Sequence, residues 1–106
     1  MNSYNKYYFV YIMSNKNRTV FYVGFTGIIK KRTYQHERGE IDGFTKKYNC
    51  KYLVYYEKYK DANVAILREK QVKKFSRKKK IKLIESKNKE MKSLNETIYK
   101  VATQFL

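Results

Sequence analysis

Hydrophobic and polar positions follow two different periods along this chain. Three short runs rich in aromatic and β-branched residues are typical of strands, and they cover residues 7–13, 19–25 and 52–57. A four-residue loop over residues 15–18 would join the first two runs as an antiparallel hairpin. That register would set Tyr11 directly opposite Tyr22, so we expect both phenols on one face of the sheet.

Between the second and third strands, the apolar period changes to that of a helix, which is predicted over residues 28–38. Its apolar side carries Ile28 and Ile29. On a helical wheel, Arg32 and His36 fall on the same side. Two polar side chains that face inward need a reason, so both are candidates for a functional site.

A loop and two more helices complete the pattern. The segment over residues 39–49 contains two glycines and is predicted to be an exposed loop. Asp61 is a suitable N-cap for a helix that ends near residue 75, and Ser76 would begin another that ends at residue 87. The first of these helices has a predicted apolar stripe formed by Val64, Leu67, Val72 and Phe75, with Ala65 at its margin.

Two charged side chains lie on or beside that stripe. Arg68 falls near its centre, where we expect a buried pair with a carboxylate or with carbonyl groups. Glu69 falls at its edge, where the carboxylate could face a cleft instead of bulk water.

The order β-β-α-β-α-α predicts an α+β fold with a three-stranded antiparallel sheet flanked by helices. A chain of 106 residues with 42% apolar residues is expected to form one domain over residues 1–95. The tail over residues 96–106 would be either helical or frayed. No apolar stretch approaches the roughly 20 residues of a spanning helix, and the N-terminal residues lack a signal core, so a cytoplasmic location is expected.

The charge balance predicts a polyanionic partner. Lys and Arg number 25 against nine acidic residues, which gives a net charge of +16. Nucleic acid is the commonest partner of such a domain, and an anionic membrane surface is the weaker alternative. Contacts to the nucleic-acid backbone, which orient a strand without reading its sequence, are expected from Lys30, Lys31, Lys46, Lys47, Lys73, Lys74, Arg77, Lys78, Lys79 and Lys80.

Candidates for chemistry on a phosphodiester are Tyr11, Tyr22, Arg32, His36 and Glu69. A phenol can relay a proton when a cation lowers its pKa, and a guanidinium can bind a phosphate through two hydrogen bonds. A single carboxylate suits Mg²⁺, which keeps much of its hydration shell. Each side chain also has a purely structural interpretation, because most of the 12 tyrosines will pack in the core and charged helix residues are usually solvated.

The order of several short motifs resembles that of the GIY-YIG nuclease superfamily, and in particular its small single-domain bacterial branch. The motifs are Phe9-Val10-Tyr11, Tyr22-Val23-Gly24, Arg32, His36 and Arg68-Glu69-Lys70. The segments over residues 43–49 and 68–84 also resemble that branch, and the likeness covers roughly residues 7–94. The chain departs from the branch in having Phe9 where many relatives have glycine, and in having no Pro or Trp.

The resemblance implies hydrolysis of DNA with one divalent cation, Mg²⁺ or Mn²⁺. Either Tyr11 or Tyr22 would assist deprotonation of the attacking water. Arg32 would steady the scissile phosphate, and His36 would support that phosphate or the leaving oxygen. Glu69 would ligate the metal. Candidates for support of the site are Gly24 and Asn88.

We therefore expect a metal-dependent DNA endonuclease module that acts in DNA repair or processing and is directed by DNA structure or free ends. A partner protein could supply targeting. The alternative is a non-catalytic nucleic-acid-binding protein on the same scaffold, and a small RNA-associated structural protein is the third interpretation.

Overall fold

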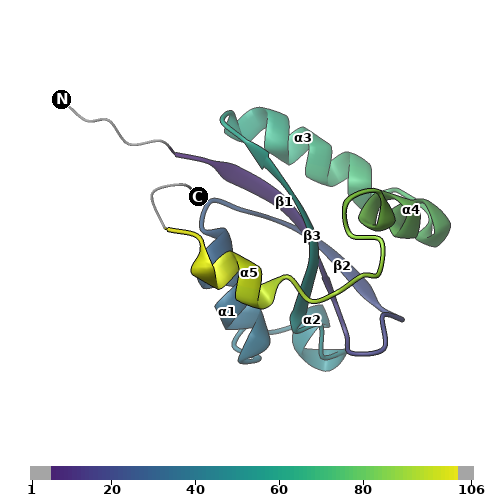
Figure 1. The fold of residues 1–106 in the computed structure, drawn as a ribbon. Coiled ribbons are helices and arrows are strands. Elements are labelled where there is room, and N and C mark those ends of the chain that lie inside the picture. The colour runs from purple at the N-terminus through teal and green to yellow at the C-terminus, as the bar shows by residue number, and fades with distance from the viewer. Residues whose placement is uncertain (1–5, 103–106) are drawn as a thin grey trace.

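The computed structural model describes residues 6–102 and has the expected α+β architecture (Figure 1). Its sheet has the order β2-β1-β3, and both pairs are antiparallel. The elements are β1 (Tyr8–Ser14), β2 (Phe21–Thr26), α1 (Ile29–Glu37), α2 (Phe44–Lys47), β3 (Tyr52–Tyr59), α3 (Ala62–Lys73), α4 (Arg77–Lys87) and α5 (Asn95–Lys100).

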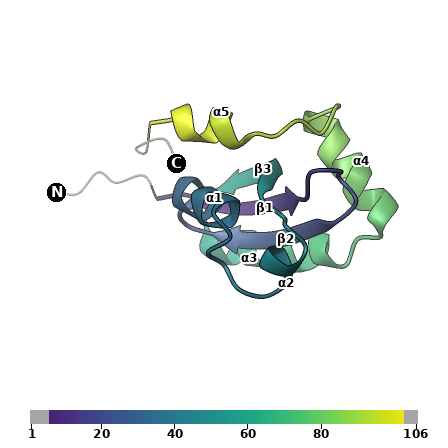
Figure 2. The ribbon, with the colours of Figure 1, turned by 90° about the horizontal axis from the view of Figure 1, so that it is seen from below.

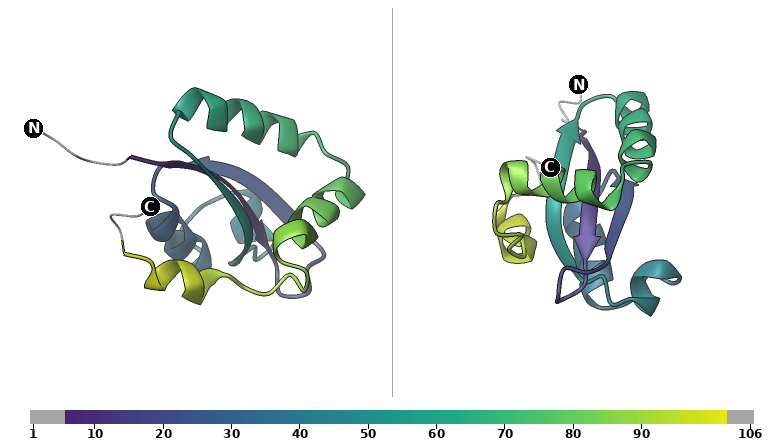
Figure 3. Two further views of the ribbon diagram at one scale, coloured as in Figure 1. Left: turned by 45° about the horizontal axis from the view of Figure 1, so that its top comes forward. Right: turned by 90° about the vertical axis from the view of Figure 1, so that its right-hand side faces the viewer.

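Helices cover both faces of the sheet, and two separate cores result. The α3 and α4 helices lie on one face, whereas α1 and α5 lie on the other (Figures 2 and 3). The central strand β1 is buried on both faces, which explains why its sequence is continuously apolar instead of alternating. Val10 and Ile12 face α3, while Phe9, Tyr11 and Met13 face α1.

The register of the β1–β2 hairpin differs from the predicted register by two residues. Tyr11 pairs with Gly24, and Tyr22 pairs with Met13, so the two phenols are diagonal neighbours and not directly opposite. The loop is longer than predicted because the side-chain oxygen of Asn15 accepts hydrogen bonds from the backbone N–H groups of Thr19 and Val20. A shift of two residues keeps the same face, so both phenols still lie on the α1 side.

Side-chain caps set the starts of α3 and α4, as predicted. The Asp61 carboxylate accepts from two backbone N–H groups at the start of α3, and the Ser76 hydroxyl accepts from the backbone N–H of Lys79. The predicted apolar stripe of α3 is wrong on one flank, because Val64 and Leu67 are 49% and 68% exposed. On the helix, Ala65, Glu69 and Val72 share the inward side, with Phe75 following just beyond α3.

The position of Arg68 explains why the inward side of α3 differs from the predicted stripe. Its guanidinium forms two hydrogen bonds of 2.9 Å with the carboxylate of Glu57 on β3, the buried pair that its position predicted. Tyr55 and Tyr59 donate their hydroxyl hydrogens to the same carboxylate. Both carboxylate oxygens of Glu57 therefore accept hydrogen bonds, and the Arg68–Glu57 pair holds α3 against β3. With Arg68 in this position, the following residue, Glu69, lies on the other flank of α3.

The remaining segments differ from expectation in detail. The predicted loop over residues 39–49 contains the single helical turn α2, and Ile28 is 43% exposed although it was expected on the buried side of α1. The chain after residue 94 forms α5, where the side chain of Asn95 bonds to Leu53 N–H, to the carbonyl of Lys51 and to Glu37. Residues 103–106 of the predicted tail lie outside the described residues. Within residues 6–102, no helix has the length and apolar character needed to cross a bilayer.

Candidate active site

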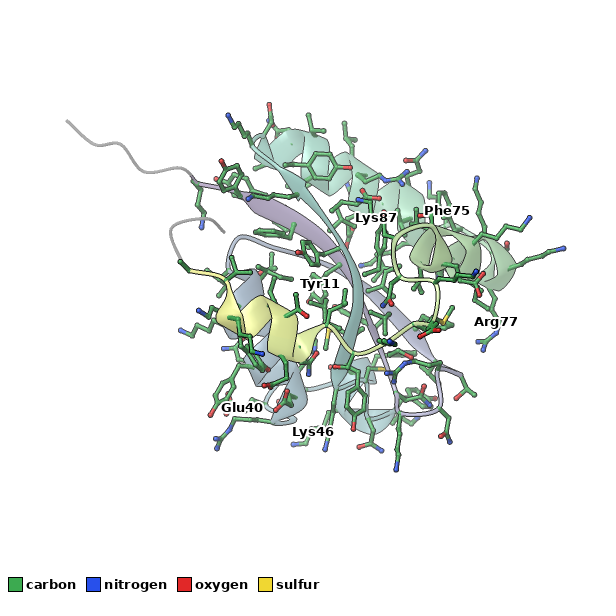
Figure 4. The ribbon with its side chains drawn as sticks, viewed as in Figure 1. Tyr11, Glu40, Lys46, Phe75, Arg77 and Lys87 are labelled. Carbon is green, nitrogen blue, oxygen red and sulfur yellow. The ribbon has the colours of Figure 1, made fainter. Side chains whose placement is uncertain are left out.

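The site is built around Tyr11, which lies in the middle of the molecule (Figure 4). Its ring lies over Gly24 of the edge strand, and a Cβ at that position would come within 2.5 Å of the phenol oxygen. The sequence therefore needs glycine there, because any side chain would displace the ring. The absence of a side chain lets a residue of the central strand reach the edge of the sheet.

His36 meets that phenol from α1. The Nε2 atom of His36 lies 3.0 Å from the Tyr11 oxygen, and both side chains are buried. Burial and then the positive charge of Arg32 lower the pKa of His36 to about 4, so the ring is neutral at neutral pH. Nδ1 is also buried and has no hydrogen-bond partner among the described residues. Because a buried N–H without an acceptor is more costly than a free lone pair, the proton belongs on Nε2, which donates to Tyr11.

Tyr22 completes a cluster of three rings. Its ring centroid lies 6.3 Å from that of Tyr11 and 5.8 Å from that of His36. Tyr22 belongs to the edge strand and is only partly buried, so it is more exposed to solvent than Tyr11. The structure thus brings together both tyrosines and the histidine that the sequence singled out.

Arg32 lies one turn before His36 on α1 and is partly buried. Its Nε donates to the side-chain oxygen of Gln35 at 3.1 Å. Its charge acts on both buried groups of the cluster, because it lowers the pKa of His36 and opposes the rise in the pKa of Tyr11. The guanidinium is therefore close to the phenol–imidazole pair.

Glu69 approaches from the other face of the sheet. Its side chain is 14% exposed and pairs with Lys73 at 2.8 Å, one turn further along α3. The carboxylate contributes to the electrostatics of Tyr11, whose pKa is raised chiefly by burial, then by Tyr22 and to a smaller degree by Glu69. The Lys73 ammonium has a raised pKa, mainly through its bond to Glu69 and in lesser part through Tyr22. Glu69 therefore acts electrostatically on Tyr11, and Tyr22 acts on Lys73.

The basic side chains that were predicted to contact nucleic acid differ in their hydrogen bonds and in their exposure. Arg77 is the first residue of α4, and its guanidinium donates to the carbonyl of Thr19 at 2.6 Å and lies over the ring of Phe21 at the start of β2. The Lys30 ammonium is engaged by the carbonyl of Val101, and Lys46 lies 3.6 Å from Asp42. The exposed members of the set are Lys31, Lys46, Lys47, Lys73, Lys74, Arg77, Lys78 and Lys79.

Asn88 lies apart from the other candidates. Its side-chain amide donates to the carbonyls of Val54 and Lys92 and accepts from the Lys92 backbone N–H. These bonds hold the chain that leaves α4 against β3, at the opposite edge of the sheet from Tyr22. The bonds of Asn88 therefore support the fold, and Gly24 leaves room for the ring of Tyr11.

Sequence reasoning missed three features of the region. The bond between Lys73 and Glu69 was not predicted, and Glu57 was not considered although it orients α3. Phe44 of α2 stacks on Tyr22 with ring centroids 6.2 Å apart. The one available signal was the aromatic pair in the segment over residues 43–49, whose place beside Tyr22 depends on the tertiary structure.

The donor set limits the kind of metal that fits. Among residues 6–102, no group of three or more His, Cys, Asp and Glu side chains could hold an ion. Glu69 is a single hard oxygen donor whose side chain is 14% exposed and whose charge acts on Tyr11. That set fits a hydrated Mg²⁺ or Mn²⁺ that takes its other ligands from water and a substrate phosphate, and not a structural metal.

Three comparisons with known proteins show the family and the fold of the chain. Residues 7–82 match the family model described as the GIY-YIG catalytic domain. The chain is 36% identical over 77 residues to the UPF0213 protein SSP2268 of Staphylococcus saprophyticus, covering 73% of this chain and 93% of that protein. It is 32% identical over 80 residues to a UPF0213 protein of Staphylococcus aureus, covering 76% and 96% of the two chains.

A solved structure is also similar. The solution NMR structure of the UPF0213 protein BH0048 from Bacillus halodurans matches with a TM-score of 0.51 and 28% sequence identity. The match covers 77% of this chain and 86% of that one. The likeness in sequence and fold therefore extends over most of both proteins.

Proposed function

Because this chain belongs to the GIY-YIG catalytic domain family, we propose that it is an endonuclease that hydrolyses DNA phosphodiesters with one divalent cation. The observation that carries the proposal is the meeting of Tyr11, Tyr22 and His36 with the charges of Arg32 and Glu69. These groups come from two strands and two helices, and packing alone gives no reason for so many polar groups to converge.

The chain supplies binding and proton handling. Arg32 is suited to hold the scissile phosphate and to stabilise the charge that develops on its oxygens. Glu69 would hold Mg²⁺ or Mn²⁺, and the ion would supply Lewis acidity and lower the pKa of a bound water. Tyr11 and His36 are both neutral at neutral pH, so neither is a strong base before substrate and cation arrive.

The bond between Nε2–H and Tyr11 gives that phenol a defined role. Because His36 donates to the Tyr11 oxygen, the hydroxyl hydrogen of Tyr11 can point towards the edge of β2, and a phenolate there would be stabilised. Tyr22 lies nearer to solvent and is the second candidate for accepting a proton from water. The exposed lysines of the predicted nucleic-acid contacts would hold the strand without reading its bases.

One observation favours the alternative, a nucleic-acid-binding protein without turnover. The Lys73 ammonium occupies the Glu69 carboxylate at 2.8 Å, so a cation has to compete with Lys73 for the ligand proposed here. In the proposed function, the phosphates of the substrate draw Lys73 away. In the alternative, the ion pair persists and the domain only binds.

A cleavage assay separates the two functions. Purified protein is incubated with single-stranded, duplex, flapped and branched DNA, with Mg²⁺, with Mn²⁺ and with chelator. We expect cleavage that needs the cation and is lost in Glu69→Gln, while the affinity for DNA changes less than about threefold. Binding without cleavage under every condition would support the alternative. A preference for RNA over DNA at matched salt would indicate that RNA is the nucleic acid bound.

A further inference from the structure

Two aromatic rings stand exposed beside the candidate site. Phe44 and Tyr48, at the start and just past the end of α2, are 47% and 41% exposed. Their ring centroids lie 4.7 Å apart. Phe44 also stacks on Tyr22 at an interplanar angle of 29°. A row of rings therefore runs from the buried Tyr11 through Tyr22 to the surface.

The short helix α2 is anchored in a way that keeps these rings outside. The residue between them in the turn, Thr45, is buried, and its carbonyl accepts from the backbone N–H of Cys50 at 2.8 Å. Cys50 is itself buried in the core on the α1 face. Thr45 thus takes the inward position of the turn, which leaves Phe44 and Tyr48 directed away from the core.

Exposed aromatic area is costly in water, so a pair of rings needs a partner. The chemistry around the pair indicates which partner. Lys46 and Lys47 flank the rings, and the Lys47 ammonium lies 5.3 Å from the centroid of Tyr48. Lys46 extends to the rim of the molecule (Figure 4) and has only a 3.6 Å contact with the well-exposed Asp42.

Flat apolar faces between cations suit a stacked nucleobase with its phosphates, a combination common in proteins that bind single strands. A second copy of the chain fits poorly, because each copy carries a net charge of +16. The aliphatic side chains exposed on α3, Val64 and Leu67, offer no ring face and lack this combination.

We propose that Phe44 and Tyr48 form a stacking platform, beside Tyr22, for an unpaired base of the strand whose phosphate is held by Arg32. This inference rests on the proposed function and specifies its substrate as a strand with unpaired nucleotides, such as single-stranded DNA or a flap. In a continuous duplex, the faces of the bases are covered by their neighbours, so a duplex cannot use the platform.

The test measures binding without divalent cation, so that hydrolysis does not enter. Anisotropy titrations at one salt concentration compare a labelled single-stranded DNA, its RNA counterpart and a DNA hairpin duplex. The test variant is Phe44→Leu with Tyr48→Leu, which keeps apolar bulk but removes the rings. The matched control is Tyr34→Leu, since Tyr34 is 47% exposed on α1 but is engaged by Arg38.

We expect the double variant to lose about tenfold in affinity for the single strands and less than twofold for the duplex. The control should match wild type. A 2-aminopurine base in the single strand should be quenched by wild type and not by the double variant. If the double variant loses the same affinity for single-stranded RNA as for single-stranded DNA, the platform contacts the base and not the sugar.

Equal losses for single strand and duplex, or no loss at all, would overturn the inference. So would a wild-type dimer that the double variant abolishes in sedimentation, because the rings would then bind a second copy. A chain that shows the stacking signature without cleaving DNA would refute the proposed function alone. A chain that cleaves single strands equally well with leucine at both positions would refute the platform alone.

Discussion

The phenol oxygen of Tyr11 lies 3.0 Å from Nε2 of His36, inside the molecule and between the central strand and α1. This contact joins a strand residue to the only histidine of the chain, 25 positions away. Burial keeps both groups neutral, and because Nδ1 has no hydrogen-bond partner among residues 6–102, we assign the proton to Nε2. The candidate site therefore begins from an uncharged pair whose proton arrangement is fixed.

That assignment predicts the titration of His36. With a pKa near 4, the ring should stay neutral and protonated on Nε2 from pH 7.5 down to about pH 5. Nitrogen-15 NMR of the single histidine reads both the tautomer and the pKa directly. In Tyr11→Phe the Nε2–H loses its acceptor, so the tautomer preference should weaken. An imidazolium signal at pH 6 in wild type would contradict the account.

Gly24 should tolerate no side chain. In Gly24→Ala the new Cβ would meet the Tyr11 ring at 2.5 Å, so the ring must move away from the edge of the sheet. We expect a loss of about 1–3 kcal/mol in the free energy of unfolding and a large loss of cleavage.

The control for that variant is Gly27→Ala. There the new Cβ would meet the end of the flexible Lys6 side chain at 2.9 Å, so the neighbour can move at little cost. Chemical denaturation and cleavage assays compare the two alanine variants. Equal stability and equal cleavage rates of the two variants would show that the close approach of Tyr11 to Gly24 matters for neither property.

The Glu57–Arg68 pair should control acid stability. Burial alone would raise the pKa of Glu57, but hydrogen bonds from Arg68, Tyr55 and Tyr59 outweigh it and lower the pKa to about 2. The unfolded chain therefore takes up this proton first, and the stabilisation is present above about pH 4.5 and is lost as the pH falls towards 2.

Urea unfolding between pH 7 and pH 2.5 measures this effect. Glu57→Gln should cost about 3 kcal/mol at pH 7 and should show a shallower loss of stability in acid than wild type. Glu85→Gln, at an exposed position of α4, is the control. If wild type and Glu57→Gln had the same dependence on pH, the proposed linkage would be wrong.

Lys73 should compete with a cation for Glu69. Removing the ammonium in Lys73→Met frees the carboxylate, so Mn²⁺ should bind about two- to fivefold more tightly in the absence of DNA. Electron paramagnetic resonance of free Mn²⁺ gives the affinity, and Lys74→Met serves as the control for the loss of one exposed positive charge. Unchanged or weaker Mn²⁺ binding would argue against Glu69 as the ligand.

Much of the fold follows from local sequence. Asp61 and Ser76 begin α3 and α4 because their side chains bond to backbone groups only two or three residues away. The faces of the strands could be predicted because a side-chain period of two tolerates a register error of two, so Tyr11 and Tyr22 still share a face.

Other features depend on partners far along the chain. The inward side of α3 was misjudged because apolar residues alone were counted. In the fold Arg68 is neutralised by Glu57 from β3, and Leu67 is left outside. The hairpin loop is lengthened by the side chain of Asn15, whose bonds replace strand pairing. Neither the Arg68–Glu57 pair nor the hydrogen bonds of Asn15 can be predicted from the period of hydrophobic residues.

The candidate site shows the same division. The sequence identified the residue types, because phenols, a guanidinium, an imidazole and a carboxylate are unusual on apolar faces. It did not identify the platform, because Phe44 reaches Tyr22 only after α2 folds back over the edge strand. Nor did it predict that Lys73 would hold Glu69 in the free protein.

If Arg32 and Glu69 act on one phosphate as a single site, as we propose, a double-variant cycle will show it. Single-turnover cleavage of a DNA flap with Mn²⁺ is measured for wild type, Arg32→Ala, Glu69→Ala and the double variant. Residues that act as a unit lose little more together than either loses alone. We predict that each single variant loses at least about a hundredfold in rate and that the double variant is scarcely slower. Losses that multiply, or single variants that cleave at the wild-type rate, would contradict a shared hydrolytic site.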